Sequence, residues 1–292
     1  QVACYQIRIV CAARRMNITH VVENLNRGGL ERMVIDLIKL QRDQGHHCQL
    51  LCLFERGVLA HELDELGIPV LACGKRRGVD LRALARLRSA LRSPATEVLH
   101  THNAVAHYHA VCASLGLGIR RIVNTRHGMG ANRRSGRREW LYRRTMAATD
   151  TVVTVCEAAR NDAVRRGIVP LSKVRVVPNG IPVNAFQIAS GQERARLRQL
   201  LEVPAQARVI GTVGRLNWTK DQASLIRAFG QVCRQLPQAI LLLIGDGELR
   251  AELQRCAEAE GVADRVRFLG DRSDVRELLR GLDLFALSSL SE

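Results

Sequence analysis

Two basic residues lie five positions apart in a segment that joins an apolar run to an amphipathic one. The segment is GRLNWTKDQ, residues 214–222, which follows VIGTV and precedes ASLIRAFGQV. This pattern predicts a strand, a turn and a helix, with Arg215 and Lys220 in the turn. Lysine is rare in this chain: only four of its 44 basic residues are lysines, and the others are arginines. A guanidinium and an ammonium at such a turn indicate an anionic ligand, such as a diphosphate.

Glycines and histidines mark further turns of this kind. ENLNRGGLER places Gly28 and Gly29 directly before a predicted helix, where backbone N–H groups and the positive helix end can meet an anion. HTHN and NTRHGMG place His102 and His127 after predicted strands. The alternative for the glycines is tight packing of the helix on the sheet. The alternative for His127 is a structural histidine whose ring bonds to the backbone.

Four histidines are crowded between residues 100 and 109. Their spacing alternates along a predicted strand and the start of a helix, so His100, His107 and His109 are expected to be structural. His102 is the one of the four that we expect to reach the ligand side of the sheet, with a structural role as its alternative.

Several familiar motifs are missing from the sequence. It contains no GxxxxGK[ST] phosphate loop, no complete GxGxxG fingerprint and no GxSxG nucleophile elbow. It also lacks an Asp-x-Asp pair that could clamp a metal-bound diphosphate, so Arg215 and Lys220 would supply the positive charge. We therefore expect neither a metal nor a cofactor.

The pattern of cysteines and the lengths of the apolar runs indicate where in the cell the protein works. The nine cysteines are scattered and form no CxxC pair, so neither a disulfide framework nor a zinc site is predicted. Free thiols favour a reducing, cytoplasmic compartment. No apolar run reaches the ~18 residues of a membrane span, and the first residues lack the pattern of a secretory signal.

Short apolar strands alternate with amphipathic helices along most of the 292 residues. The turn-rich stretch PNGIPVN, residues 178–184, is the best candidate for a linker between two domains. We expect these domains at residues 16–182 and 183–292. Residues 1–15 are expected to be a non-native leader, because Met16 opens the first natural strand.

Strands are expected at residues 17–22, 48–53, 68–73, 97–102, 120–125, 151–155, 173–178, 208–213, 239–245, 266–270 and 282–289. Helical segments between them indicate a parallel sheet with helices on both faces. Two such series predict an α/β protein of two doubly wound, Rossmann-like domains that face a cleft. Ligands of such sheets bind beyond the carboxyl ends of the strands.

The net charge of +16 invites comparison with nucleic-acid-binding proteins. No helix-turn-helix, RNA-binding aromatic pair or zinc pattern accompanies the charge, so no nucleic-acid partner is expected. Residues Arg133–Arg144 instead place six arginines around Trp140 and Tyr142, which suits an anionic membrane surface. A solvated charged face, rich in arginine because of a GC-rich coding sequence, is the alternative.

Longer stretches of the sequence resemble glycosyltransferase family 4, whose members have the two-domain GT-B fold. The matching stretches, in family order from Met16 onward, are RGGLER, TRHG, VVPNGI, GTVGRLNWTKD, LLLIGDGELR, VRFLGDRSDV and the final LSSLSE. The likeness is strongest to bacterial sugar transferases of exopolysaccharide assembly. It implies a UDP- or GDP-linked sugar donor, transfer without a metal, and retention of the anomeric configuration. It also implies a glycan or lipid-linked acceptor at the inner face of the cell membrane.

The resemblance assigns roles to individual residues. Arg215 and Lys220 would hold the diphosphate and stabilise it as the leaving group. His127 stands where the family has a histidine beside the reacting sugar. Gly28 and Gly29 would let their loop approach the phosphates or the acceptor.

Three further residues follow from the same resemblance. Gly245 and Asp246 are expected to shape a turn near the nucleotide. Glu292 matches the first glutamate of the family's Glu-x7-Glu motif, which orients the donor sugar. The chain stops there, so we expect an incomplete second domain that is inactive alone. Cys156 stands where the family usually has serine, at a predicted helix start where either residue fits.

Two other functions remain open at this point. A nucleotide-sugar epimerase of the same two-domain shape would release free nucleotide and an epimerised sugar without any acceptor. A non-catalytic fragment would bind the sugar nucleotide without turning it over. Product analysis distinguishes all three.

Overall fold

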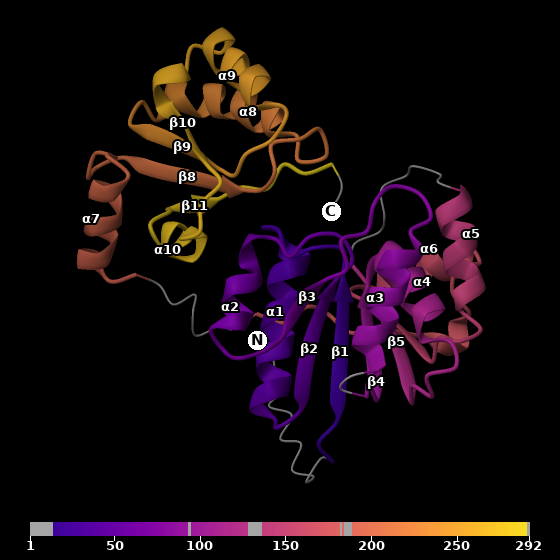
Figure 1. The fold of residues 1–292 in the computed structure, drawn as a ribbon. Helices are drawn as coiled ribbons and strands as arrows, with labels where there is room; N and C mark the ends of the chain where they lie inside the picture. The colour runs from indigo at the N-terminus through magenta and orange to yellow at the C-terminus, as the bar shows by residue number, and fades with distance from the viewer. Residues whose placement is uncertain (1–13, 93–94, 128–135, 182, 184–188, 291–292) are drawn as a thin grey trace. The chain divides into compact units, whose positions relative to one another are not determined.

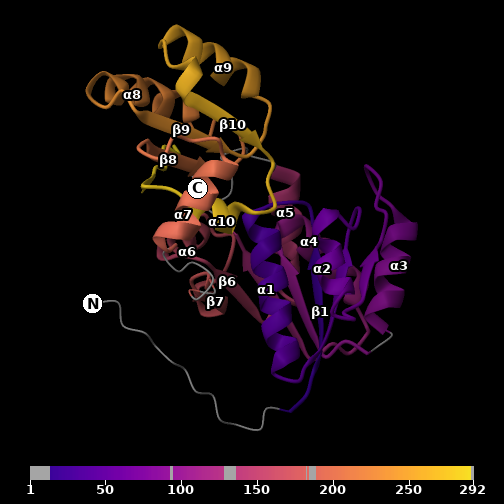
Figure 2. The ribbon, with the colours of Figure 1, turned by 90° about the vertical axis from the view of Figure 1, so that its left-hand side faces the viewer.

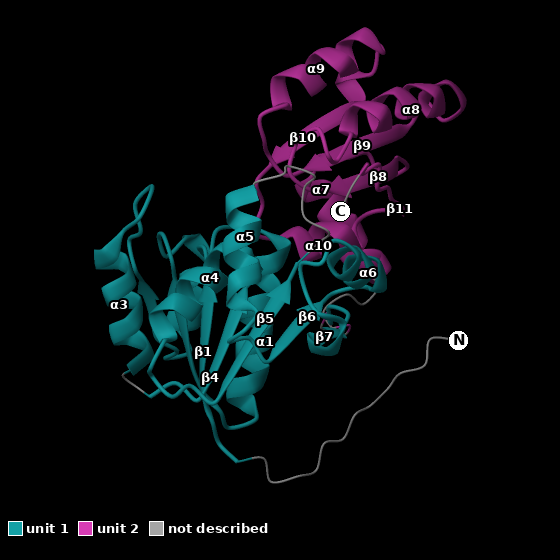
Figure 3. Cartoon of the chain, turned by 90° about the vertical axis from the view of Figure 1, so that its right-hand side faces the viewer, with its two compact units in different colours: residues 1–180 teal, residues 181–292 magenta. Residues whose placement is uncertain are grey.

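The computed structural model describes residues 14–92, 95–127, 136–181, 183 and 189–290. The chain divides into two compact units, Gln1–Gly180 and Ile181–Glu292, and we describe each by itself (Figure 3). This boundary falls two residues before the expected one. Of the expected leader, residues 1–13 lie outside the described part of the chain.

The first unit is built on a seven-stranded parallel sheet of order β3-β2-β1-β4-β5-β6-β7 (Figure 1). Its strands are β1 (Asn17–Val22), β2 (His47–Cys52), β3 (Val70–Ala72), β4 (Val98–His102), β5 (Arg121–Arg126), β6 (Thr151–Thr154) and β7 (Val174–Val176). The strand order reverses between β1 and β4. Ligands of doubly wound sheets bind at the carboxyl ends of the strands beside such a reversal.

Helices cover both faces of this sheet (Figures 1 and 2). They are α1 (Gly29–Asp43), α2 (His61–Asp64), α3 (Leu81–Arg92), α4 (Asn103–Ser114), α5 (Gly136–Thr145) and α6 (Glu157–Arg165). Val21 packs with residues of α3 and α4, whereas its neighbour Val22 packs with residues of α1. Both faces of this strand are therefore buried, including its polar residues Thr19 and His20.

The second unit has a parallel sheet of order β10-β9-β8-β11 (Figure 1). Its elements are α7 (Gly191–Leu200), β8 (Arg208–Val213), α8 (Gln222–Gln235), β9 (Ala239–Ile244), α9 (Arg250–Ala259), β10 (Val266–Gly270), α10 (Val275–Arg280) and β11 (Leu284–Phe285). Leu241 and Leu243 pack with α8 and α9, while Leu242 packs with Leu278 of α10. Two Rossmann-like α/β units are thereby confirmed. That they face a cleft stays a prediction.

The last strand is shorter than the expected 282–289. Only Leu284–Phe285 pairs with β8. Beyond it, the hydroxyl of Ser288 donates to the carbonyl of Lys220 at 2.8 Å, and the N–H of Leu290 donates to the carbonyl of Thr219 at 2.8 Å. The chain leaves the sheet because these groups bond to the turn after β8 instead of to a neighbouring strand.

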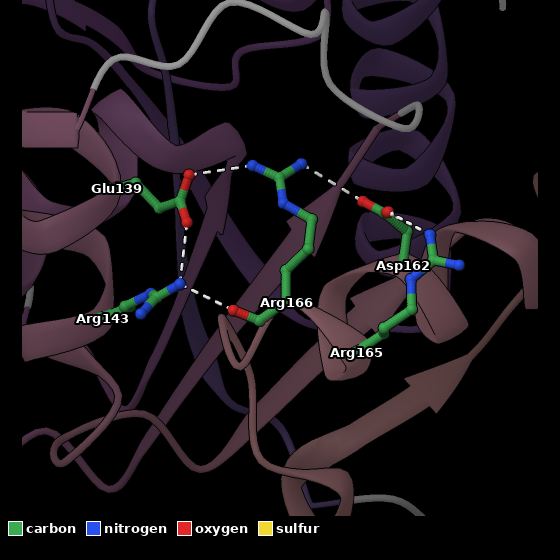
Figure 4. A network of polar contacts seen from close by, with 5 residues as sticks. All are labelled: Glu139, Arg143, Asp162, Arg165 and Arg166. Atoms are coloured by element: carbon green, nitrogen blue, oxygen red, sulfur yellow. Dashed lines mark hydrogen bonds and ion pairs between the residues drawn. The ribbon is translucent and has the colours of Figure 1, made fainter.

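Two acidic residues connect α5 to the end of α6 (Figure 4). Glu139 pairs with Arg143 and with Arg166, at 2.9 Å each. Asp162 pairs with Arg165 at 3.0 Å and with Arg166 at 3.3 Å. Arg143 belongs to the basic segment expected at a membrane surface, so part of the charge of that segment is neutralised within the unit. The cysteine expected at a helix start does cap α6, because its Sγ accepts a backbone N–H at 3.4 Å.

A second ion-pair group joins α1 to α2. Arg32 donates hydrogen bonds of 2.7 and 2.6 Å to the two carboxylate oxygens of Glu62, and Lys39 Nζ lies 2.9 Å from one of them. These bonds, that of Arg32 above all, lower the pKa of Glu62 to about 2. The carboxylate therefore stabilises the fold where it is ionised and loses this effect as it is protonated.

We expect Glu62→Gln to lower the free energy of unfolding by about 1–2 kcal/mol at neutral pH. The full pKa shift would correspond to ~3 kcal/mol, but water screens this partly exposed group and reduces its effect. Since the folded pKa is depressed, the contribution is complete above the ordinary glutamate pKa and fades as the pH falls from 4.5 to about 2. Urea unfolding at about pH 7 and about pH 3 measures it. The exposed Glu65→Gln is the control. A difference from wild type that does not shrink in acid would contradict this role.

Candidate functional site

The turn between β8 and α8 carries the basic pair singled out in the sequence. Arg215 is exposed and Lys220 is half-buried. Within residues 189–290, the Arg215 side chain forms no ion pair. The buried Gln222 donates to the carbonyl of Arg215 at 3.0 Å, and the side-chain oxygen of Asn217 accepts the N–H of Lys220 at 3.3 Å. These bonds hold the backbone that carries both cations.

This turn is bonded along its backbone to the turn that follows β9. The N–H groups of Gly214 and Leu216 donate to the carbonyls of Ile244 and Asp246, at 2.9 and 3.0 Å. The close approach of the two turns requires a glycine at position 245, because a Cβ there would overlap the carbonyl oxygen of Gly214. The backbone of Gly245 also has a φ of 132°, which residues with a side chain rarely adopt.

Asp246 and Gly247 complete the second turn. The exposed carboxylate of Asp246 accepts the N–H of Gly247 at 2.8 Å and pairs with Arg250 at 3.2 Å. A Cβ on Gly247 would overlap the carbonyl oxygen of Leu216. Gly245 and Asp246 therefore belong to the turn that packs against, and is hydrogen-bonded to, the turn of the basic pair.

Gly28 and Gly29 lie in the first unit, at the start of α1. Gly28 is the extended residue that precedes the 15-residue helix. The carboxylate of Glu31 folds back over it, so an added Cβ there would overlap a Glu31 oxygen. Apart from the chain neighbours of Gly29 and the backbone of its own helix, no atom of the described residues lies within 4 Å of its Cβ position. The carboxylate of Glu31 already interacts favourably with the positive end of the helix at Gly28. The part of this helix end that a ligand could approach is therefore at Gly29.

His102 and His127 meet at the carboxyl ends of the neighbouring strands β4 and β5. Nδ1 of His102 lies 3.2 Å from Nε2 of His127. The backbone N–H of His127 donates to the side chain of Asn103 at 3.3 Å. Burial lowers the pKa of His127 to about 4 and that of His102 well below 6.5, so both rings are neutral at physiological pH. Nδ1 of His127 is buried without a hydrogen-bond partner among the described residues.

Sequence reasoning missed His20, which extends this pair. It lies on β1 opposite His100 of β4, and its Nδ1 is 3.2 Å from Nε2 of His102. No spacing rule reveals this contact, because only the register of two strands far apart in the chain creates it. His107 has the structural role expected of it, since its two nitrogens lie 2.7 and 3.0 Å from threonine hydroxyls.

Glu23 is a second residue that the sequence did not single out. It directly follows β1 and is half-buried. Burial raises the pKa of this carboxyl, although Arg138 of α5 opposes the shift. Tyr108 of α4 lies in the same electrostatic neighbourhood. A carboxyl with a raised pKa at the ligand end of a parallel sheet is a candidate for a polar role in binding.

Two expected site elements fall wholly or partly outside the described residues. They are Glu292 and residues 128–135, which contain the first part of the basic segment. In its second part, Trp140 is 57% exposed and the guanidinium of Arg144 stacks over its ring at 5.5 Å. Tyr142 is buried and donates to Asn124 at 2.6 Å, so it belongs to the core and not to a surface. Of the described helices, none has the length and apolarity to cross a membrane.

We expect Gly247→Ala to destabilise the second unit by about 1–3 kcal/mol, because its methyl group must push apart the two bonded turns. Thermal unfolding of the chain measures the loss. Gly191→Ala is the matched control, since at the first position of α7 an added methyl group meets no described atom within 4 Å beyond its chain neighbours and its own helix backbone. Equal melting temperatures for the two variants would show that the turns are not tightly packed.

Sequence models of two glycosyltransferase families match consecutive parts of this chain. The model described as Glycosyltransferase Family 4 matches residues 27–185. The model described as Glycosyl transferases group 1 matches residues 193–292. The chain is also 24% identical over 290 residues to the UDP-Gal:alpha-D-GlcNAc-diphosphoundecaprenol alpha-1,3-galactosyltransferase of Escherichia coli, covering 95% of this chain and 74% of that protein.

Solved structures show the same fold. Anabaena HepE in complex with UDP and glucose superposes with a TM-score of 0.80 at 24% identity, covering 94% of this chain and 74% of that one. WaaG, a glycosyltransferase involved in lipopolysaccharide biosynthesis, superposes with a TM-score of 0.68 at 17% identity, covering 94% and 75%. The first family match spans more than half of the sequence, and the fold agrees with it. The chain therefore belongs to glycosyltransferase family 4 and is a glycosyltransferase of the GT-B fold.

Proposed function

We propose that this glycosyltransferase moves a sugar from a UDP- or GDP-linked donor to a glycan or lipid-linked acceptor. The transfer retains the anomeric configuration and uses no metal ion at the diphosphate. The proposed setting is cell-surface or exopolysaccharide synthesis, in the cytoplasm at the inner face of the cell membrane.

One observation carries the proposal: Arg215 and Lys220 project from one backbone-bonded turn at the carboxyl end of β8. Parallel sheets bind their ligands at this end. The exposed guanidinium of Arg215, which has no acidic partner within residues 189–290, can pair with two phosphate oxygens at once. The absence of an Asp-x-Asp pair from the sequence supports a diphosphate held by these cations alone.

The relatives support the choice of donor and acceptor. HepE has been solved with UDP-glucose as well as with UDP and glucose. The E. coli relative is named for a UDP-Gal donor and an acceptor linked to undecaprenol through a diphosphate. A UDP-linked donor and a lipid-linked acceptor are therefore the first substrates to test.

In the proposed reaction, the bond between the anomeric carbon and the phosphate oxygen breaks while the acceptor hydroxyl forms a bond to that carbon on the same face. The leaving diphosphate takes the proton of the acceptor hydroxyl, so no covalent nucleophile is needed. Arg215 and Lys220 stabilise the charge that grows on the diphosphate. His127 is neutral and offers its unpaired Nδ1 to the reacting sugar.

The remaining residues support binding in this proposal. Gly28 and Gly29 let the loop before α1 approach the phosphates or the acceptor, and Gly29 is the open position. Glu292 orients the donor sugar. Gly245 and Asp246 hold the turn beneath the basic pair.

The epimerase and the non-catalytic binder remain the rivals. An epimerase produces free UDP and an altered sugar when no acceptor is present, whereas a transferase needs the acceptor. A binder takes up UDP without turnover. Product analysis by NMR, with and without acceptor, separates the three and also shows whether the anomeric configuration is retained.

In a form of the enzyme that turns over the donor, we expect Arg215→Ala and Lys220→Ala each to lower kcat/KM by at least ~100-fold, as for the loss of one preorganised electrostatic donor. The affinity for UDP, measured by calorimetry, should fall in parallel. Arg234→Ala is the control, because Arg234 is an exposed arginine on α8, outside the turn. Wild-type kinetics in both turn variants would disprove the assignment of the diphosphate site.

Membrane association through the basic segment gives a separate prediction. Trp140→Ala and Arg144→Ala should each weaken binding to phosphatidylglycerol vesicles by about fivefold, roughly 1 kcal/mol per contact. Sedimentation with vesicles at low and high salt measures this. Trp218→Ala is the matched control, since Trp218 is a 66% exposed tryptophan of the second unit. Equal vesicle binding by all three variants and wild type would place the contact elsewhere.

A further inference from the structure

Three histidines of the first unit gather on one face of the sheet. His20 of β1, and His100 and His102 of β4, each have a ring nitrogen within 4.8 Å of those of the other two. The strand geometry causes this, because His20 and His100 are direct partners in the parallel register and His102 lies two residues further on the same face. The ring centroids of His100 and His102 are 4.4 Å apart.

Each of these rings uses its other nitrogen for a neighbour outside the group. The neighbours are Gln41 Oε1 at 2.7 Å from His20 Nε2, Thr125 Oγ1 at 2.8 Å from His100 Nε2, and His127 Nε2 at 3.2 Å from His102 Nδ1. The nitrogens that remain are Nδ1 of His20, Nδ1 of His100 and Nε2 of His102. Metal-binding histidines are oriented in this way, with one nitrogen on the ion and the other held by a hydrogen bond.

The distance between two of the remaining nitrogens agrees with a tetrahedral ion. Nδ1 of His20 and Nε2 of His102 are 3.2 Å apart. Two nitrogens bound to one zinc ion at ~2.0–2.1 Å are about 3.3 Å apart in a tetrahedral arrangement. A hydrogen bond between these two rings satisfies the same distance, so the case for an ion rests on the third ring, that of His100, whose ligand nitrogen lies within 4.8 Å of the other two. Imidazole ligands favour Zn²⁺ and similar ions over Mg²⁺ and Ca²⁺.

We propose that His20, His100 and His102 bind one divalent transition-metal ion of the Zn²⁺ type. Three histidines leave the fourth position of such an ion for water or another ligand. His100 is the partly exposed member of the group, and His20 and His102 are buried. The site lies within the first unit and does not involve the donor diphosphate, so this proposal stands or falls independently of the proposed function.

The ion would also set the direction of one hydrogen bond at the candidate site. With Nε2 of His102 on the metal, its Nδ1 carries the proton and donates to Nε2 of His127. A neutral His127 must then carry its own proton on Nδ1, which becomes a donor. Without the ion, the amide oxygen of Gln41 requires a proton on Nε2 of His20, so Nδ1 of His20 accepts a hydrogen bond from Nε2 of His102. Nδ1 of His102 then accepts a hydrogen bond from Nε2 of His127, which leaves Nδ1 of His127 unprotonated and therefore an acceptor.

Titration of the chelator-treated 292-residue chain with Co²⁺ tests the proposal. We expect one equivalent to bind, with the strong visible absorption of tetrahedral cobalt, and Zn²⁺ to displace it. His100→Gln should weaken binding by at least ~100-fold, and loss of the orienting bond in Gln41→Leu by roughly 10–100-fold. The exposed His47→Gln should bind as wild type does.

Three outcomes would overturn the proposal. They are substoichiometric binding in wild type, equal affinity in wild type and both cluster variants, and the near-ultraviolet charge-transfer absorption of cobalt bound to thiolates. Far-ultraviolet circular dichroism verifies that each variant is folded. Should His100→Gln misfold, Gln41→Leu decides alone, since Gln41 lies on the half-buried side of α1 and is not a metal ligand.

Discussion

Backbone hydrogen bonds between the turns after β8 and β9 determine where the basic pair of the second unit can lie. Gly214 donates to the carbonyl of the last residue of β9 and Leu216 donates to a carbonyl of the turn after it, and Gly245 permits that approach. Arg215 therefore projects from a backbone that cannot move without breaking bonds to a buried strand. Charge that is fixed before the reaction is the form of electrostatic stabilisation that enzymes use most effectively.

The first unit presents a different chemistry at the carboxyl end of its sheet. There His102 is buried and His127 is half-buried, and burial keeps both rings neutral at physiological pH. The open helix end at Gly29 offers backbone N–H groups. At the carboxyl ends of the strands, the second unit thus presents the cations Arg215 and Lys220, whereas the first presents neutral histidines together with the carboxyl of Glu23.

Much of the fold followed from the sequence, because continuous apolar strands alternating with helices permit little besides parallel sheets covered on both faces. The turns after β4, β5 and β8 were predictable for the same reason. The end of β11 was not, because Ser288 and Leu290 bond to a turn that no local pattern indicates. The contact of His20 with His102 was equally hidden, since strand register is a tertiary property. Tyr142 was placed at a surface on composition alone, yet its hydroxyl has a buried partner.

The central claim is that the turn after β8 holds the diphosphate of a sugar nucleotide. A crystal structure of the chain with bound UDP tests it most directly. We expect the Arg215 guanidinium and the Lys220 ammonium to lie within ~2.7–3.2 Å of diphosphate oxygens, with the backbone of the turn unchanged. UDP bound with both side chains directed into solvent, or bound away from the carboxyl end of β8, would contradict it.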